Sequence, residues 1–137
     1  MTVSVRMSAS DLLGNGSDNS HCVIDEAHLE RMTLGDRALE RDLLRIFVRQ
    51  NATILDRITV RDLVAVAAAA HTMIGSARGI GAWRVAKAAE QLARAADEGD
   101  ETDVGEAIAA LKSASLEVNV AIDARLADPS HPISDCA

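Results

Sequence analysis

Apolar and polar residues repeat with the spacing of an α-helix along most of the chain. Over 103–126 the apolar positions follow alternating steps of four and three residues, the period of a helix that buries one face. Similar spacing runs over 36–58, 61–80 and 83–98, and a shorter helical segment covers 24–33. The pattern therefore predicts five helices, the first of them short, and no strands.

Each longer segment has a predicted inward stripe. Over 36–58 the stripe is interrupted by Gln50 and consists of Leu39, Leu43, Ile46, Phe47, Ile54 and Ile58. Over 61–80 it consists of Leu63, Val66, Ala70, Met73, Ala77 and Ile80. Over 83–98 it consists of Val85, Ala89, Leu92 and Ala96. Over 103–126 it includes one serine and consists of Val104, Ile108, Leu111, Ser115, Val118 and Ile122.

Capping residues mark where these helices begin and end. Asp25 is the predicted N-cap of the first helix, and Asp36 begins the second. Thr59, followed three residues later by Asp62, resembles a capping box for the third. The residues that end the helices are Gly35, Gly79 with Gly81, Gly99, and the pair Asp128–Pro129.

Four longer helices joined by short glycine-containing loops favour an all-α domain. We expect an antiparallel four-helix bundle with a short additional N-terminal helix over residues 24–127. Residues 1–20 are rich in Ser, Asn, Gly and Asp, and we expect a flexible N-terminal tail there. We also expect residues 128–137 to form a flexible C-terminal tail.

Composition and charge narrow the functional classes. Of 137 residues, 48% are hydrophobic but only 1% aromatic, which fits one helical domain and argues against a β-sandwich. A net charge of −7 disfavours nucleic-acid binding, because phosphate contacts need a positive surface. We expect no membrane-spanning helix, no secretory signal and a cytoplasmic location. Cys22 and Cys136 lack the spacing of a metal site or a disulfide framework.

The third predicted helix presents a histidine to solvent. At 100° per residue, His71 lies roughly 135° from the centre of the buried stripe. Gly75 and Arg78 share its face one and two turns later, and Ala67 and Ala68 precede it. A glycine inside a helix costs about 1 kcal/mol relative to alanine. One reason to retain it is that another molecule must approach the backbone beside the imidazole, although a lone surface histidine usually has no role.

Other chemical arrangements are weaker. His21, Cys22 and His28 lie near one another in sequence, but no fourth metal ligand has suitable spacing. His131 and Cys136 fall in the expected C-terminal tail. The sequence contains no convincing Ser–His–Asp or Cys–His arrangement and no glycine loop that would cradle a phosphate.

Residues 70–100 resemble the core of a histidine-containing phosphotransfer (HPt) domain. That family carries a histidine, a lysine three residues later, a glycine, and a stretch of small residues that ends in Gly–Ala. The segment IDEAHLERMTLGD is also similar to the family, so the resemblance spans roughly residues 24–126. The matching positions are His71, Gly75, Ser76, Ala77, Ile80, Gly81 and Ala82.

The resemblance implies a function and a set of partners. His71 would take a phosphoryl group from a phospho-aspartate of a receiver domain and pass it to an aspartate of another, and Gly75 would leave room for the receiver. The partners would be response-regulator receiver domains and a hybrid sensor histidine kinase. The chain would be a monomeric carrier with transferase character, not an ATP-dependent kinase. It would need no cofactor of its own, and the receiver would bring Mg²⁺.

One position departs from the family pattern. The chain has Ile74 where the family has the lysine that counters the phosphoryl charge. Arg78 is the best local substitute, because it shares the face of His71 at about 10.5 Å of helical rise and helix side chains lean toward the N-terminus. Arg84 and Lys87 are weaker candidates. Ile74 itself fits core packing or an apolar contact with a receiver.

Two other readings stay open. The chain could be a degenerate HPt-like binding module that docks on a receiver or kinase without carrying phosphate, and the missing lysine favours this reading. It could also be an unrelated bundle with a cofactor or metal inside, although the predicted inward stripes hold no histidine or carboxylate pairs. By analogy with the family, apolar residues of 36–58 and the small residues around His71 would form the receiver-docking patch.

Overall fold

The computed structural model describes residues 23–58, 61–131 and 133, and in that part of the chain every regular element is a helix. The all-α prediction is therefore confirmed, with helix ends within about two residues of those expected. The helices are α2 (Glu26–Thr33), α3 (Arg37–Arg57), α4 (Leu63–Ile80), α5 (Trp83–Glu98) and α6 (Glu101–Ala127).

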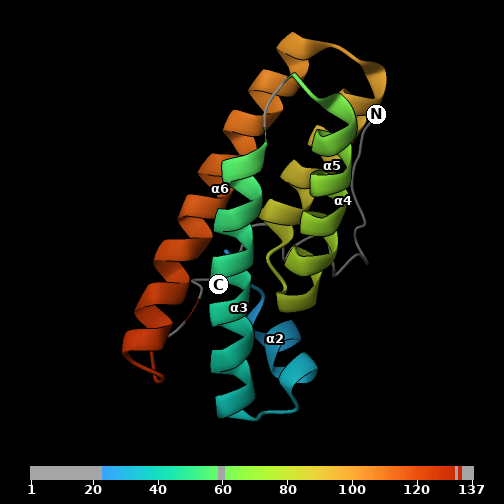
Figure 1. The fold of residues 1–137 in the computed structure, drawn as a ribbon. Coiled ribbons are helices and arrows are strands. Elements are labelled where there is room, and N and C mark those ends of the chain that lie inside the picture. The colour runs from blue at the N-terminus through green and yellow to red at the C-terminus, as the bar shows by residue number, and fades with distance from the viewer. Residues whose placement is uncertain (1–22, 59–60, 132, 134–137) are drawn as a thin grey trace, which may run out of the picture.

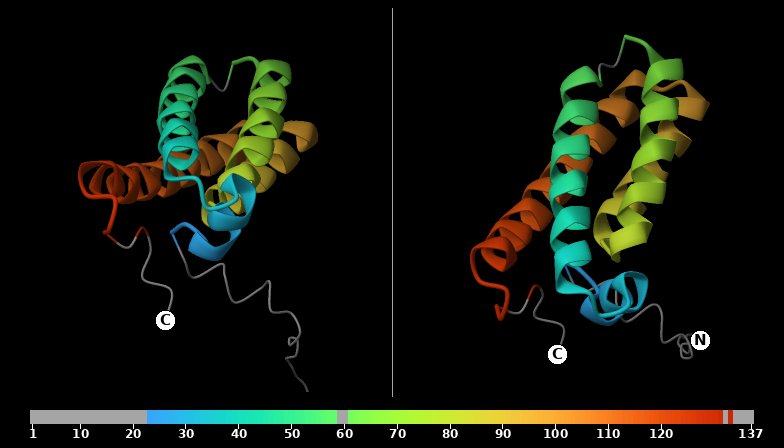
Figure 2. Two further views of the ribbon diagram at one scale, coloured as in Figure 1. Left: turned by 90° about the horizontal axis from the view of Figure 1, so that it is seen from below. Right: turned by 60° about the horizontal axis from the view of Figure 1, so that its bottom comes forward.

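The helices pack into one bundle. α4 and α5 share the most extensive contact and are joined by a two-residue turn, Gly81–Ala82. α6 packs along α5 and α3, while α3 lies beside α4 (Figures 1 and 2). The short α2 crosses one end of the bundle and contacts α3 and α4. The outer faces of α3 and α4 are thus exposed next to each other.

Aspartates begin four of the helices. Asp25 and Asp36 accept hydrogen bonds from backbone N–H groups of the first turns of α2 and α3, as predicted. Asp62 accepts a hydrogen bond from Ala65 N at 3.1 Å and is itself the N-cap of α4. The prediction that Asp62 closes a capping box three residues after its N-cap is therefore wrong. Thr59 lies outside the described residues. Asp100 caps α6, which therefore begins at Glu101 instead of near residue 103.

The predicted stripes of α5 and α6 are confirmed, because every residue in them is buried. On α4 the stripe is buried from Val66 to Ile80, and only Leu63 is half-buried. Alanines line much of this core, especially on α5, which explains how α4 and α5 approach closely. The helical period therefore located the core face of three helices correctly.

The predicted stripe of α3 is partly wrong. Leu39 is 42% exposed and Ile46 is 51% exposed. The helix turns a different face inward, because two of its four buried positions are polar and pair with other helices. Asn51 Nδ2 donates to Ser115 Oγ of α6 at 3.4 Å. The four buried residues of α3 are Glu40, Leu44, Phe47 and Asn51.

Arg125 of α6 holds one end of the bundle together. Its side chain is 5% exposed. Nε and Nη2 donate to the two carboxylate oxygens of Glu40 at 3.0 and 3.2 Å, and Nη1 donates to Glu26 of α2. Burial lowers the pKa of Arg125, but the hydrogen bonds and charges of Glu26 and Glu40 outweigh it, so the pKa is raised. The guanidinium stays charged and links three helices.

The segment after α6 folds back onto this cluster. Arg125 Nη1 also donates to the carbonyl oxygen of His131 at 2.9 Å. Ile133 is 2% exposed, and its backbone N–H donates to Glu26 at 3.4 Å. Residues 131 and 133 of the expected C-terminal tail thus contact the bundle, whereas residues 132 and 134–137 lie outside the described residues. The local sequence, with its two prolines, carries no signal for a contact with α2.

Within the described residues, one helix, α4, is long and apolar enough to span a membrane by length and composition alone. One face of this helix packs into the bundle core, and the core helix of a helical bundle meets the same criterion. Packing accounts for the apolar residues of α4 that are buried, which are Val66, Ala70, Met73, Ala77 and Ile80.

We expect Arg125→Met to lower the free energy of unfolding by about 3 kcal/mol or more, because Glu40 stays buried and keeps only the 3.4 Å contact with the exposed Arg37. Glu117→Gln, which breaks the exposed pair Arg84–Glu117, is the matched control and should cost less than about 1 kcal/mol. Chemical denaturation measures both. Equal effects of the two variants would contradict a special role for the buried cluster.

Candidate functional site

His71 lies in the middle of α4 and is exposed, as the helical arithmetic predicts. No side chain or backbone group in the described part of the chain hydrogen-bonds its ring. Ala68 beside it is exposed, and Val64, two turns earlier on the same face, is 82% exposed. The imidazole therefore stands free on a surface of small and apolar side chains.

Gly75 leaves open space one turn after His71. A Cβ built on Gly75 would meet no atom within 4 Å, setting aside the backbone of its own helix and its chain neighbours. Packing inside the chain thus gives no reason for a glycine here. The same is true of Gly79, one turn further on. Both glycines expose helix backbone at the surface beside His71.

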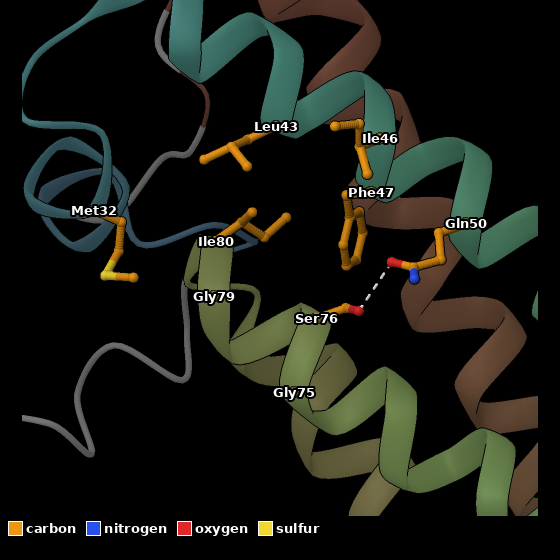
Figure 3. Close-up of a pocket in the computed structure, with 9 residues that line it drawn as sticks. All are labelled: Met32, Leu43, Ile46, Phe47, Gln50, Gly75, Ser76, Gly79 and Ile80. Atoms are coloured by element: carbon orange, nitrogen blue, oxygen red, sulfur yellow. Dashed lines mark hydrogen bonds between the residues drawn. The ribbon is translucent and has the colours of Figure 1, made fainter.

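A groove of about 260 Å³ runs between α3 and α4 beside these glycines (Figure 3). Its lining is mostly apolar. Ser76 Oγ and Gln50 Oε1 lie 3.1 Å apart and join its two walls by a hydrogen bond. The lining residues are Met32, Leu43, Ile46, Phe47, Gln50, Gly75, Ser76, Gly79 and Ile80.

A second depression along the α3–α4 seam shares Ile46 and Gln50 with the groove. Its lining also includes the charged Arg49 of α3 and Thr72 of α4. Thr72 is the neighbour of His71 in the chain. At the other end Met32 of α2 projects over the groove and is exposed. The surface from Met32 to Thr72 is named the α3–α4 surface below.

Arg78 is engaged with another helix. Its guanidinium forms an ion pair with Glu90 of α5 at the surface. Arg78 and His71 share a face of α4, so this pair shows that their face borders α5, whereas the groove borders α3. The nearest cation on that face is therefore partly neutralised by a carboxylate in the unphosphorylated protein.

The other positions considered for charge compensation differ from Arg78. Ile74 is half-buried and packs against the hydrophobic core, which fits its place at the edge of the buried stripe. Arg84 pairs with Glu117 of α6 and so borders a different helix. Lys87 is exposed on α5. Arg78 stays the only one of these cations on the His71 face.

Asp25 fixes the end of α4, a role that sequence patterns did not reveal. Its backbone N–H donates to Gly81 O at 2.9 Å, and its carboxylate accepts from Trp83 Nε1 at 3.1 Å. A Cβ on Gly81 would lie 3.0 Å from Asp25 atoms, and Gly81 has a φ of +79°. Both facts require glycine. The turn between α4 and α5 is thereby locked to α2.

His28 belongs to this same junction. Its Nε2 donates to the carbonyl oxygen of Arg78 at 2.8 Å, and its ring lies 5.0 Å from the Trp83 ring. His21 and Cys22, its possible partners at a metal site, lie outside the described residues. Among residues 23–58, 61–131 and 133, no three His, Cys, Asp or Glu side chains are grouped as a metal site. His28 has a structural role at the end of α4.

Comparison with known proteins gives one match. The family model described as the Hpt domain matches residues 42–125, which is well over half of the chain. The matched region runs from α3 into α6 and includes His71. No curated protein and no solved structure matches the chain.

We expect Gly75→Ala to raise the free energy of unfolding by up to about 1 kcal/mol, because alanine is the better helix former and its methyl group meets open space. Gly81→Ala is the matched control. It should destabilise by about 1–2 kcal/mol, because a side chain at φ +79° is strained and would crowd Asp25. Thermal or chemical denaturation measures both, and a destabilising Gly75→Ala would mean that the glycine serves the fold.

Proposed function

Because the chain belongs to the Hpt domain family, we propose that it is a phosphorelay intermediate that carries a phosphoryl group on His71. Membership of this family connects the chain with two-component phosphorelays. The observation that carries the finer proposal is the exposed, unpartnered imidazole of His71 on a face cleared by Gly75. In this proposal α3 to α6 form the antiparallel four-helix bundle that presents the histidine.

The transfer step uses the lone pair of a His71 ring nitrogen. A neutral imidazole attacks phosphorus in line with the aspartyl oxygen of a phosphorylated receiver. A phosphorus–nitrogen bond forms while the phosphorus–oxygen bond breaks, and the receiver aspartate leaves as a carboxylate. Transfer to a second receiver reverses these bond changes. The chain supplies position and a nucleophile, so it is a carrier with transferase character and not a kinase that uses ATP.

In this proposal the receiver contributes charge-neutralising groups of its own during transfer. Mg²⁺ and a lysine on the receiver would stabilise the three phosphoryl oxygens during transfer. The surface around His71 must leave room for the receiver groups that carry this Mg²⁺ and lysine. Gly75 and Ala68 provide that room, because neither projects a side chain beyond a methyl group next to His71.

The α3–α4 surface is the proposed docking site for receivers. It combines an apolar groove with exposed Ile46 and Met32, and it extends to Thr72, which is next to His71 in the chain. Such a surface fits an apolar helix face of a partner that binds transiently. A hybrid sensor histidine kinase and response regulators, all presenting receiver domains in the cytoplasm, are the proposed partners.

A docking module without phosphate transfer is the second candidate function. Two observations favour it: Ile74 replaces the family lysine, and Arg78 is already paired with Glu90. The carrier proposal therefore requires Arg78 to leave Glu90 and turn toward the phosphoryl group. In the unphosphorylated protein the Glu90 carboxylate occupies the guanidinium that the phosphoryl group would bind.

Replacement of the histidine separates these two functions. We expect His71→Gln to abolish phosphate uptake from phosphorylated receivers of the same genome, while it retains receiver binding and changes the free energy of unfolding by less than about 0.5 kcal/mol. His131→Gln, another exposed histidine, is the control and should take up phosphate normally. Uptake by His71→Gln, or no uptake by the wild-type chain from any receiver, would refute the carrier function.

Charge compensation by Arg78 has its own test. We expect Arg78→Ala to shorten the lifetime of phospho-His71, and Glu90→Gln and Ile74→Lys to lengthen it, each by up to about fivefold, since an exposed ion pair contributes at most about 1 kcal/mol. Phosphate release from the isolated phosphoprotein measures this. Glu117→Gln removes the same charge away from the site and should leave the lifetime unchanged. An unchanged lifetime in Arg78→Ala would eliminate Arg78 as the compensating cation.

A further inference from the structure

The longest helix carries two stripes with the same spacing. The buried stripe of α6 faces the core, as described above. A second set of residues, also spaced by alternating steps of four and three, lies on the opposite side of α6, and every member is exposed. This outer seam consists of Ala109, Ser113, Leu116, Val120, Asp123 and Ala127.

Two large apolar side chains form the middle of the outer seam. Leu116 is 65% exposed and Val120 is 63% exposed, one turn apart. Small side chains lie at both ends of the seam. A row of this kind, with a four–three repeat and apolar residues at its centre, is the surface that a helix uses to pack against another helix with small crossing angle.

We propose that the outer seam is a homodimer interface, in which α6 of a second copy packs antiparallel against it. The seam is self-complementary about a two-fold axis at the level of residue 118. Leu116 then faces Val120 of the second copy, and Ala109 faces Ala127 of the second copy. Ser113 faces Asp123 of the second copy, where a hydroxyl can donate to a carboxylate. Such isologous pairing closes as a dimer.

The charges beside the seam favour this orientation. Lys112 and Asp123 lie on the same side of the apolar centre, and both are exposed. In the described part of the chain neither has an ion-pair partner of its own. Antiparallel packing brings Lys112 of each copy beside Asp123 of the other, twice in the dimer. Parallel packing would instead bring the two Asp123 carboxylates together.

The dimer leaves the phosphotransfer site open. α6 contacts α3 and α5 but not α4, and Figure 1 shows it on the side of the bundle away from α4. Both copies of His71 and both α3–α4 surfaces therefore stay accessible to receivers. The resemblance described above implied a monomer, so the dimer departs from that expectation. The inference concerns assembly and does not depend on the proposed function.

Sedimentation equilibrium of the full, unphosphorylated chain tests the dimer. One helix pair buries less than the roughly 1,200 Å² of a standard interface, so we expect a weak dimer with a Kd on the order of 100 μM. The wild-type mass should rise toward that of a dimer between about tenfold below and tenfold above this value. Leu116→Glu should stay monomeric throughout. Val64→Glu, which changes an exposed apolar residue of α4, is the matched control and should dimerise as the wild type does.

Charge reversal tests the orientation. Lys112→Glu alone and Asp123→Lys alone should each weaken dimerisation several-fold, and the double variant should restore it, because the pairs re-form with exchanged signs. Circular dichroism checks that each variant is folded. A monomeric wild type at the highest concentration overturns the proposal, as does a dimer that survives Leu116→Glu or one that is lost in Val64→Glu. Two weakened single variants without rescue in the double variant overturn the antiparallel pairing.

Discussion

A guanidinium can stay inside a helical bundle only if carboxylates neutralise it, and Arg125 places this constraint on the whole structure. Glu40 of α3 and Glu26 of α2 form the ion pairs that neutralise Arg125. Because Glu40 must face inward, α3 is rotated away from the orientation that its apolar residues alone would select. Leu39 and Ile46 are thereby left at the surface. The buried ion pair therefore decides which face α3 exposes next to α4. Ile46, which was predicted to be in the core, lines the apolar groove as a result.

Asp25 fixes the C-terminal end of α4, the helix that carries His71. Asp25 caps α2, bonds to the backbone of Gly81 and accepts from the Trp83 indole, so that α2, α4 and α5 meet at one point. α2 is thus held by Asp25 on one side and by Glu26 on the other, and it contributes Met32 to the groove. The helix that bears His71 is rigidly held at its C-terminal end, while the residues around His71 are small. Stability and accessibility are provided by different parts of α4.

The electrostatics of the site follow from the acidity of the chain. With Ile74 at the position of the family lysine, an added phosphoryl group increases the negative charge of a chain whose net charge is already −7. Glu90 holds the Arg78 guanidinium on the face of α4 that carries His71, and its carboxylate would compete with a phosphoryl group for that guanidinium. On the far side of the bundle, Asp123 of the outer seam and the nearby Lys112 have no ion-pair partner within the described residues.

The sequence alone determined the five helices, most of their ends, the buried faces of α4, α5 and α6, and the exposure of His71. These follow from signals within one or two helical turns: capping aspartates, glycines with positive φ, and the spacing of apolar residues. Only the tertiary structure decided the rotation of α3, the packing of Ile133, the pairing of Arg78 and the groove beside Gly75. Each depends on partners distant in sequence, such as Arg125 and Glu40, which are 85 residues apart. From sequence, a polar residue is predicted to be exposed unless its buried partner of opposite charge is known. The spacing of apolar residues does not identify that partner.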